Sequence, residues 1–268
     1  MTDVHVHLHP PRLFAAIRRW FAERSPWPLT HPTEPDAVAR ALREHGVDRF
    51  VFCSYAHKPG IAGELNAWLA STARALGDGA FALGTVHVDD DPTAQMRAAL
   101  RDGCIGLKVH EDVQRFGSDD PQLSGALDAV ADADGFVLVH VGHIPWSMET
   151  DDGPARVLRV LARHPRLKIV VAHFGVPDSA RYLAAAAREP RLFLDTTMIF
   201  APESPMRHPV DAAAVGAGAA QIVYGTDYPN VPYPYDGELR GLRALGLDAA
   251  ALRAITAENA RRLAPALA

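Results

Sequence analysis

Five apolar stretches of this chain each end in a side chain that could bind a metal ion or carry a proton. They are Asp3-Val4-His5-Val6-His7, Leu107-Lys108-Val109-His110, Leu138-Val139-His140, Val170-Val171-Ala172-His173 and Val223-Tyr224-Gly225-Thr226-Asp227. One histidine at the end of a strand is more often a hydrogen-bonded structural group than a ligand. Several at successive strand ends predict convergence at one mouth of a parallel barrel, where the carboxyl ends of the strands meet.

The H-x-H pair is the first element of such a site. Residues two apart in an extended strand face the same side, so His5 and His7 point inward together. His9 continues the alternation, but the two prolines after it end the strand and leave it at the rim. Imidazole is the commonest zinc ligand and carboxylate completes such sets, so Asp227 and two to four of the histidines His5, His7, His140 and His173 form a plausible open metal site. The alternative for each histidine is a structural hydrogen bond, and for Asp227 a helix N-cap.

The elements that position these residues are repeated strand and helix units. Short β-branched or aromatic runs alternate with segments of helical spacing. We expect eight strands, at residues 4–8, 49–53, 80–86, 105–109, 136–141, 168–172, 192–196 and 222–225. The pattern predicts an α/β fold, a distorted (β/α)₈ TIM barrel, with a helical or loop insertion after the first strand at residues 10–35.

Composition limits the kinds of function. The 268 residues are 48% hydrophobic, which favours a single domain over 1–268. The net charge of −5 and the scattered Lys and Arg exclude a field suited to nucleic acid or an anionic membrane, so a small-molecule substrate is expected. There is no leader or long apolar span, which favours a cytoplasmic protein. Cys53 and Cys104 are expected as reduced, buried thiols, and a homodimer or homotetramer is compatible with this shape.

Taken together, the motifs resemble the amidohydrolase superfamily and, within it, the amidohydrolase-related (amidohydrolase 2) branch of metal-dependent hydrolases with TIM-barrel folds. The resemblance covers essentially the whole chain. The stretches that carry it are Asp3-Val4-His5-Val6-His7, Gly106-Leu107-Lys108-Val109-His110, Val139-His140-Val141-Gly142, Ala172-His173-Phe174-Gly175, Gly225-Thr226-Asp227-Tyr228-Pro229 and Glu258-Asn259-Ala260-Arg261-Arg262-Leu263.

The resemblance implies a role for each matching residue. His5 and His7 would bind the first divalent metal, and Asp227 would complete its shell and act on the hydrolytic water. His140 matches a ligand of that metal in single-metal members, or of the second metal in two-metal members. His173 matches a histidine that polarises the substrate or assists proton transfer when it is not itself a ligand. Zn²⁺ is the expected ion, with Mn²⁺ as the alternative.

Lys108 leaves the number of metal ions open. It matches a strand-four lysine that can be carbamylated in two-metal members and bridge the metals, because an unmodified ammonium would repel them. An unmodified Lys108 could instead bind a substrate carboxylate. We favour one ion and keep two as the alternative.

The reaction expected from this resemblance is hydrolysis. Zinc can lower the pKa of its water to about 7, and Asp227 would receive the proton. The metal and His173 would stabilise the oxyanion formed on an amide, ester or lactone carbonyl. The alternative is a metal-dependent, non-oxidative decarboxylase related to aminocarboxymuconate-semialdehyde decarboxylase. A non-catalytic metal-binding barrel is disfavoured because all five ligand-type positions are filled.

Residues after the strands give hints about the substrate. Gln114 and Arg115 follow the fourth predicted strand, and Trp146 and Met148 follow the fifth. Such side chains suit a small substrate that is carboxylated or cyclic, although solvated loop residues are the alternative for each. We predict that Lys108, His110 and Arg115 bind the substrate.

Overall fold

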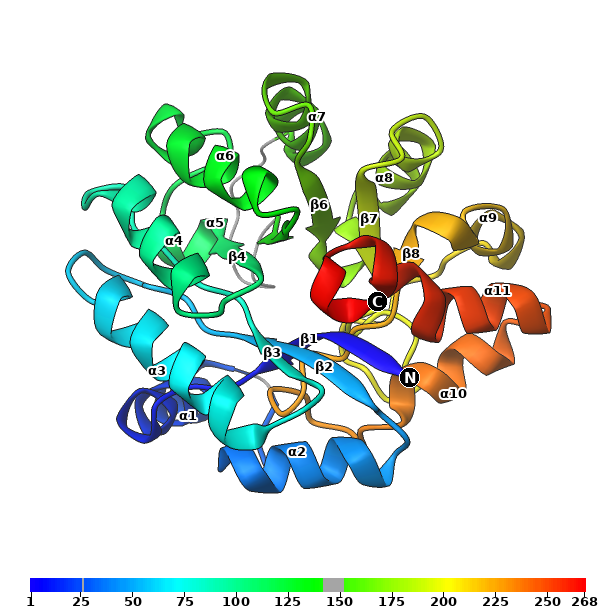
Figure 1. The fold of residues 1–268 in the computed structure, drawn as a ribbon. Coiled ribbons are helices and arrows are strands. Elements are labelled where there is room, and N and C mark those ends of the chain that lie inside the picture. The colour runs from blue at the N-terminus through cyan, green and yellow to red at the C-terminus, as the bar shows by residue number, and fades with distance from the viewer. Residues whose placement is uncertain (26, 142–151) are drawn as a thin grey trace.

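The computed structural model describes residues 1–25, 27–141 and 152–268 of the chain. Within them, eight parallel strands alternate with helices around a central ring (Figure 1). The strands are β1 (Thr2–His7), β2 (Arg49–Cys53), β3 (Ala80–Ala82), β4 (Gly106–His110), β5 (Phe136–His140), β6 (Lys168–Val171), β7 (Leu192–Asp195) and β8 (Ile222–Val223). Each coincides with a predicted run, but β3 and β8 end earlier than the expected residues 86 and 225.

The helices surround the ring of strands. They are α1 (Pro11–Arg24), α2 (Pro35–Glu44), α3 (Ala62–Leu76), α4 (Pro92–Arg101), α5 (Glu111–Gln114), α6 (Ser124–Asp132), α7 (Gly153–Arg163), α8 (Ser179–Ala186), α9 (Ala212–Ala217), α10 (Gly237–Ala244) and α11 (Ala249–Arg253). Several begin at an aspartate whose carboxylate accepts a backbone N–H of the first turn, as Asp91, Asp152 and Asp248 do. These side chains satisfy amides that a helix start leaves without an intrahelical partner.

The strands form two hydrogen-bonded groups that close into one barrel. The first group has the order β1-β2-β3 and the second the order β4-β5-β6-β7-β8. Parallel bridges join Gly84 to Leu107 on one side and Val6 to Tyr228 on the other. The ring is therefore continuous but distorted where β3 and β8 are short, which confirms the predicted TIM barrel.

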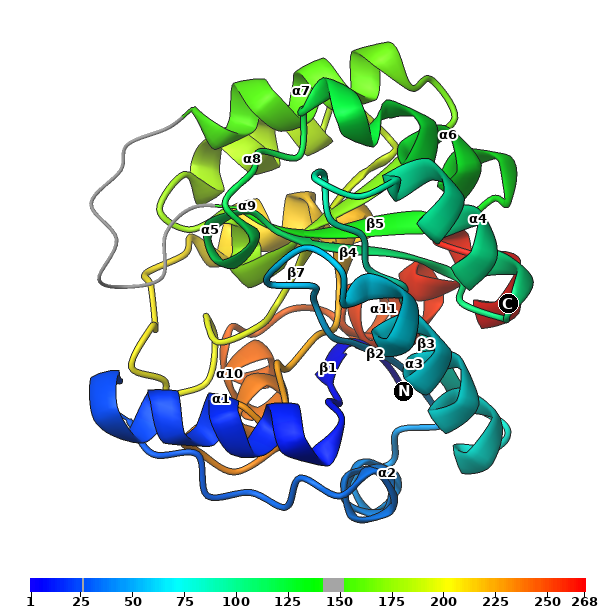
Figure 2. The ribbon, with the colours of Figure 1, turned by 90° about the vertical axis from the view of Figure 1, so that its left-hand side faces the viewer.

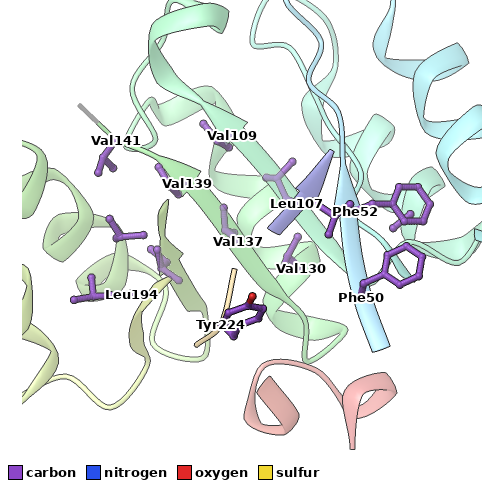
Figure 3. Packing of buried hydrophobic residues seen from close by; sticks show 14 of the residues in the cluster. Phe50, Phe52, Leu107, Val109, Val130, Val137, Val139, Val141, Leu194 and Tyr224 are labelled. Carbon is purple, nitrogen blue, oxygen red and sulfur yellow. The ribbon is translucent and has the colours of Figure 1, made fainter. Parts of the chain in front are cut away.

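Two apolar layers lie on opposite faces of the strands. The outer layer packs strands against helices, as Phe50, Leu107 and Val137 do, with Val130 of α6 beside them (Figure 3). The inner layer fills the barrel at the amino ends of the strands; its members include Val4, Val51, Phe136, Leu138, Val170, Phe193, Leu263 and Leu267. The last two come from the carboxyl-terminal segment, which lies across the ring in Figure 1 and closes that end.

The insertion after β1 contains α1 and an irregular segment that leads to α2. It contacts the opposite end of the barrel, the mouth, because the Phe14 ring packs edge-on against His9 with 4.9 Å between centroids. The His31 Nε2 atom is 2.8 Å from the carbonyl oxygen of Tyr233, which follows β8. Figure 2 shows α1 on the mouth side, away from the carboxyl-terminal segment. None of the described helices is both long and apolar enough to cross a bilayer.

Candidate metal centre at the barrel mouth

The strand alternation brings the predicted site residues to one end of the barrel. On β5, Leu138 faces the apolar interior, so His140 two residues later faces the interior at the mouth. The β4–β5 register pairs His110 with His140 and Lys108 with Leu138, which places the β4 side chains at matching depths. His5, His7, His110, His140, His173 and Lys108 are all buried.

Three side chains form the centre of the site. The Nε2 atoms of His5 and His7 lie 3.2 Å apart. One carboxylate oxygen of Asp227, Oδ1, is 2.8 Å from His7 Nε2 and 3.3 Å from His5 Nε2. Asp227 has a positive φ of 63°, a conformation that turns the chain sharply after β8 and costs energy for an L residue. Three potential ligand atoms, two from β1 and one from the turn after β8, therefore point at one place.

Asp195 at the end of β7 holds this centre from behind. Its Oδ2 is 2.7 Å from His5 Nδ1, and its Oδ1 accepts the backbone N–H of His173 at 2.8 Å and of Thr197 at 3.1 Å. A carboxylate at Nδ1 fixes the proton there and leaves the His5 Nε2 lone pair for a ligand. Asp195 was not among the predicted site residues, although Leu192–Asp195 is an apolar run that ends in an acid, the same signal that marks the other strand ends.

His140 and His173 form a second imidazole pair. His173 Nε2 is 2.9 Å from His140 Nδ1, and the His173 Nδ1 atom is buried without a hydrogen-bond partner among the described residues. If His140 donates from Nδ1, its Nε2 lone pair is free for a metal and His173 carries its proton on Nδ1. The His110 ring stacks on His140 with 3.9 Å between centroids.

Lys108 is buried within the same site. Its Nζ atom is 3.2 Å from His5 Nε2, and only 1% of the residue is exposed. Within residues 1–25, 27–141 and 152–268 it forms no ion pair with a carboxylate. A buried ammonium without a counter-charge is costly, so the position suits a lysine that is covalently modified or paired with an anionic ligand.

The electrostatics separate neutral imidazoles from one charged pair. Burial, followed by the charge of Lys108, lowers the pKa of His5 well below its usual value, and burial has the same effect on His110 and His140. Burial also opposes protonation of His7, but its interactions with Cys53 and with the Asp227 carboxylate outweigh burial and raise its pKa to about 10. For Asp227, the interactions with His7 overcome burial and hold its pKa well below the ordinary range. The pKa shifts therefore favour one ion pair, His7 with Asp227, among otherwise neutral imidazoles.

A second layer supports His7. The Cys53 Sγ atom is 3.7 Å from His7 Nδ1, and Cys53 forms with His5 and His7 a group whose potential ligand atoms lie within 4.8 Å of one another. His9, expected at the rim, is buried and stacks on His7, and its Nδ1 is 2.7 Å from Ser54 Oγ. Cys53 and Cys104 are free and buried, as predicted.

The residues after β4 and β5 differ from the expectation for substrate contacts. Arg115 ends α5 in a left-handed conformation and is exposed, with no side-chain hydrogen bond or ion pair to the described residues. Gln114 is buried and structural: it accepts the His110 N–H and donates to the carbonyl oxygens of Ala56 and Val86. Gly142, Trp146 and Met148 lie outside the described residues.

The donor set fits a divalent cation. Two imidazole nitrogens each about 2.1 Å from one tetrahedral zinc lie about 3.4 Å apart, close to the 3.2 Å between the Nε2 atoms of His5 and His7. The fixed proton on His5 Nδ1 and the adjacent carboxylate of Asp227 meet the other requirements of such a centre. The residues present are therefore compatible with a bound metal ion.

Comparisons with known proteins agree with this architecture. The family model described as amidohydrolase matches residues 2–265. No curated protein sequence matches the chain. Similar solved structures include an uncharacterized TIM-barrel protein from Bordetella bronchiseptica, with a TM-score of 0.76, 22% identity, and coverage of 100% of this chain and 99% of that one.

Two other similar structures carry named activities. A putative 2-pyrone-4,6-dicarboxylic acid hydrolase from Pseudomonas putida has a TM-score of 0.69, 19% identity, and coverage of 98% and 96% of the two chains. A 5-carboxyvanillate decarboxylase from Novosphingobium aromaticivorans, complexed with manganese and 4-hydroxy-3-methoxy-5-nitrobenzoic acid, has a TM-score of 0.64, 15% identity, and coverage of 98% and 95%. At these identities the likeness concerns the fold.

Proposed function

Since the chain belongs to the amidohydrolase family, we propose that it is a metal-dependent hydrolase that cleaves an amide, ester or lactone bond of a small substrate, carboxylated or cyclic. The observation that carries the proposal is the convergence of His5 Nε2, His7 Nε2 and Asp227 Oδ1 within 3.3 Å. The family is generally metal-dependent, which supports the same assignment. We favour Zn²⁺, with Mn²⁺ as the alternative.

The protein groups that would hold one ion are His5, His7 and Asp227, with His140 as a further ligand through its Nε2 atom. The ion, when bound, supplies Lewis acidity and lowers the pKa of water toward neutrality. A second ion would require Lys108 to lose its positive charge, as carbamylation does, because the ammonium lies 3.2 Å from His5 Nε2. The absence of a carboxylate partner for Lys108 among the described residues keeps this alternative open.

Asp227 and His173 would carry the proton transfers. Asp227 is held ionised and retains 14% side-chain exposure, so it can accept the proton of an attacking water and return it to the leaving group. His173, in the tautomer that frees His140 for a ligand, presents an N–H at Nδ1 that has no partner among the described residues. Such a donor suits the oxygen on which negative charge develops.

His110 and Lys108 would bind the substrate. The His110 Nδ1 atom accepts the Val113 N–H at 3.4 Å, so its Nε2 carries the proton and can donate to a substrate oxygen. An unmodified Lys108 offers the only lysine charge at the described part of the site, and it would attract a carboxylate. Arg115, which is exposed, remains a weaker candidate for the same task.

The second candidate function is non-oxidative decarboxylation. It is favoured by one observation, that a similar structure with manganese is a carboxyvanillate decarboxylase. In that case Asp227, once it had accepted a proton from water, or His173 would deliver a proton to carbon as carbon dioxide leaves. The same protein ligands serve both reactions, so the reaction must be distinguished by its products.

Metal content tests the shared premise. Elemental analysis of protein purified without chelator should find about one zinc or manganese per chain, and both His5→Ala and Asp227→Ala should lose it. His208→Ala, which removes an exposed histidine, is the matched control and should keep the ion. About two ions would favour a carbamylated Lys108, whereas no ion after addition of zinc or manganese would contradict the proposal.

Product analysis tests the reaction. The metal-loaded protein is assayed against small lactones, esters and amides bearing a carboxylate, and against aromatic carboxylic acids. Acid release with an Asp227-dependent rate supports hydrolysis. Carbon dioxide release without hydrolysis of any panel member would replace the first candidate by the second.

A further inference from the structure

We propose that Asp3 is a positioning residue that orients both His5 and Asp227 by joining the bulge in β1 to the turn after β8. This inference rests on the proposed metal site, because it assigns the group that aligns its ligands. Asp3 began the first motif of the sequence but received no role in the proposed reaction. It is fully buried, and its carboxylate makes contacts on both sides of the seam where the barrel closes.

The first observation is the irregular register of β1. Asp3 pairs with Phe50 and Val6 with Phe52, so three steps along β1 match two steps along β2. One extra residue in a strand is a β-bulge, and it reverses the side to which later side chains point. Val4 faces the inner apolar layer, and beyond the bulge His5 faces the interior too, whereas Val6 joins the outer layer. Without the bulge, His5 and His7 would point away from the site.

The second observation is that the Asp3 side chain accepts a hydrogen bond from a backbone N–H within the bulge. Its Oδ1 accepts the backbone N–H of His5 at 3.1 Å, two residues along the same strand. A carboxylate that bonds the amide two residues ahead holds a local turn in place of a regular extended conformation. The direction of the His5 ring is therefore tied to the Asp3 side chain.

The third observation concerns the other oxygen of Asp3. Oδ2 accepts the hydroxyls of Thr226 at 2.7 Å and Tyr235 at 3.0 Å. Thr226 Oγ1 in turn accepts the Tyr228 N–H at 3.2 Å. The side chain of the residue before Asp227 is thus hydrogen-bonded to the backbone of the residue after it. The Asp227 N–H donates to the His5 carbonyl at 2.8 Å. These bonds hold Asp227 in its left-handed conformation next to His5.

One carboxylate thus accepts three hydrogen bonds, and two of its three donors lie beside or within the ligand-bearing segments. Among the described residues Asp3 forms no ion pair, so its partners are neutral N–H and O–H groups. Asparagine at this position keeps the size but replaces one acceptor oxygen by a donor. Asp3→Asn therefore breaks the join between the two segments while it keeps the packing.

The experiment uses the full chain stripped of metal and then titrated with Co²⁺ alone. For Asp3→Asn we expect Co²⁺ affinity to fall by roughly 10- to 100-fold, the usual range for residues behind a ligand. The visible absorption of bound Co²⁺ should change, because it reports ligand geometry, while the melting temperature shifts little. Asp48→Asn, an exposed aspartate before β2, is the matched control and should bind Co²⁺ as the parent does.

Hydrogen exchange in the metal-free state separates this inference from the proposed function. The amides of Asp227 and Tyr228 should exchange at least about tenfold faster in Asp3→Asn than in the parent. If the parent binds no Co²⁺, Zn²⁺ or Mn²⁺, the proposed metal site fails while exchange still decides the role of Asp3. Parent-like exchange and a parent-like Co²⁺ spectrum in Asp3→Asn would overturn the inference.

A second variant covers the case in which Asp3→Asn does not fold. Thr226→Val removes only the hydroxyl that relays Asp3 to the turn after β8, and its methyl groups keep the volume. It should give the same faster exchange at Tyr228 and the same direction of change in the Co²⁺ spectrum. Unchanged exchange and spectrum in Thr226→Val would contradict the relay.

Discussion

The two ends of the barrel interior are built from the same strands but differ in chemistry. At the amino ends, Val51, Leu138 and Phe193 pack with Leu267 into an apolar layer. At the mouth, the next inward positions on β5 and β7 carry the buried side chains of His140 and Asp195. One end gains stability from apolar burial, whereas the other accepts the cost of buried polar groups and holds them with hydrogen bonds. On β5 and β7 a regular alternation along the strand thus separates the residues that give stability from those that could do chemistry.

The largest effect should come from removing a central ligand at the mouth. In Asp227→Asn we expect hydrolysis to fall on the order of a thousand-fold, because both the metal shell and the proton acceptor are altered. Steady-state kinetics on the best substrate of the panel, together with metal analysis, measure it. Asp78→Asn makes the same change at an exposed residue before β3 and should leave both values unchanged. Full activity in Asp227→Asn would show that Asp227 is neither an essential metal ligand nor the proton acceptor.

Truncation of a side chain in the apolar layer should lower the stability of the fold and leave metal binding unchanged. Leu138→Ala leaves a cavity among fully buried side chains, so the free energy of unfolding should fall by about 2–5 kcal/mol. Metal content at low temperature should stay that of the parent. Urea unfolding and elemental analysis measure the two quantities. Loss of metal without loss of stability would show that the two ends are not separable.

The support behind the ligands should give a smaller effect. Asp195→Asn weakens the acceptor that faces His5 Nδ1 at 2.7 Å, and metal affinity should fall by roughly 10- to 100-fold. Competition for zinc with a chromophoric chelator measures this loss. His173 should also lose part of its backbone support, since its N–H donates to the same carboxylate. A zinc affinity equal to that of the parent would show that Asp195 contributes to packing and does not orient His5 for metal binding.

A further effect concerns pH and a buried carboxyl group at the mouth end that lies outside the metal centre. Glu238 of α10 accepts the Tyr233 hydroxyl and the N–H groups of Phe200 and Ala201, and burial raises its pKa to about 8 despite these bonds. The folded state therefore keeps a proton that the unfolded state releases above the ordinary glutamate pKa of 4.5. The free energy of unfolding should fall as pH rises through this window, by at most about 1.4 kcal/mol per unit.

The Glu238→Gln variant isolates this contribution. Gln does not titrate, so the difference in unfolding free energy between variant and parent should grow in favour of the variant from pH 5 to pH 8. Urea unfolding at several pH values measures the difference. A difference that does not depend on pH would show that Glu238 has an ordinary pKa in the folded state.

The sequence predicted the fold because eight apolar runs with helical segments between them leave few alternatives to a barrel. It also predicted which strand ends meet, since His110 and His140 close neighbouring strands of equal length. It did not reveal Asp195, whose acid ends an apolar run as the others do but lacks a histidine to mark it. Nor could it place Asp3, because ideal alternation puts Asp3 and His5 on one face. Only the register of β1 against β2 shows that the phase changes between them.

The extra residue in β1 has a consequence for transplanting this site. Copying the segment Thr2–His7 onto a regular strand of another barrel, with Val4 kept inward, would point its two histidines into the surrounding helices. The portable unit is the bulged segment together with the carboxylate that holds it and the hydroxyl of the neighbouring turn. The site therefore depends on the junction between the first and last strands. A designer would have to transfer the bulged segment of β1 and the turn after β8 together.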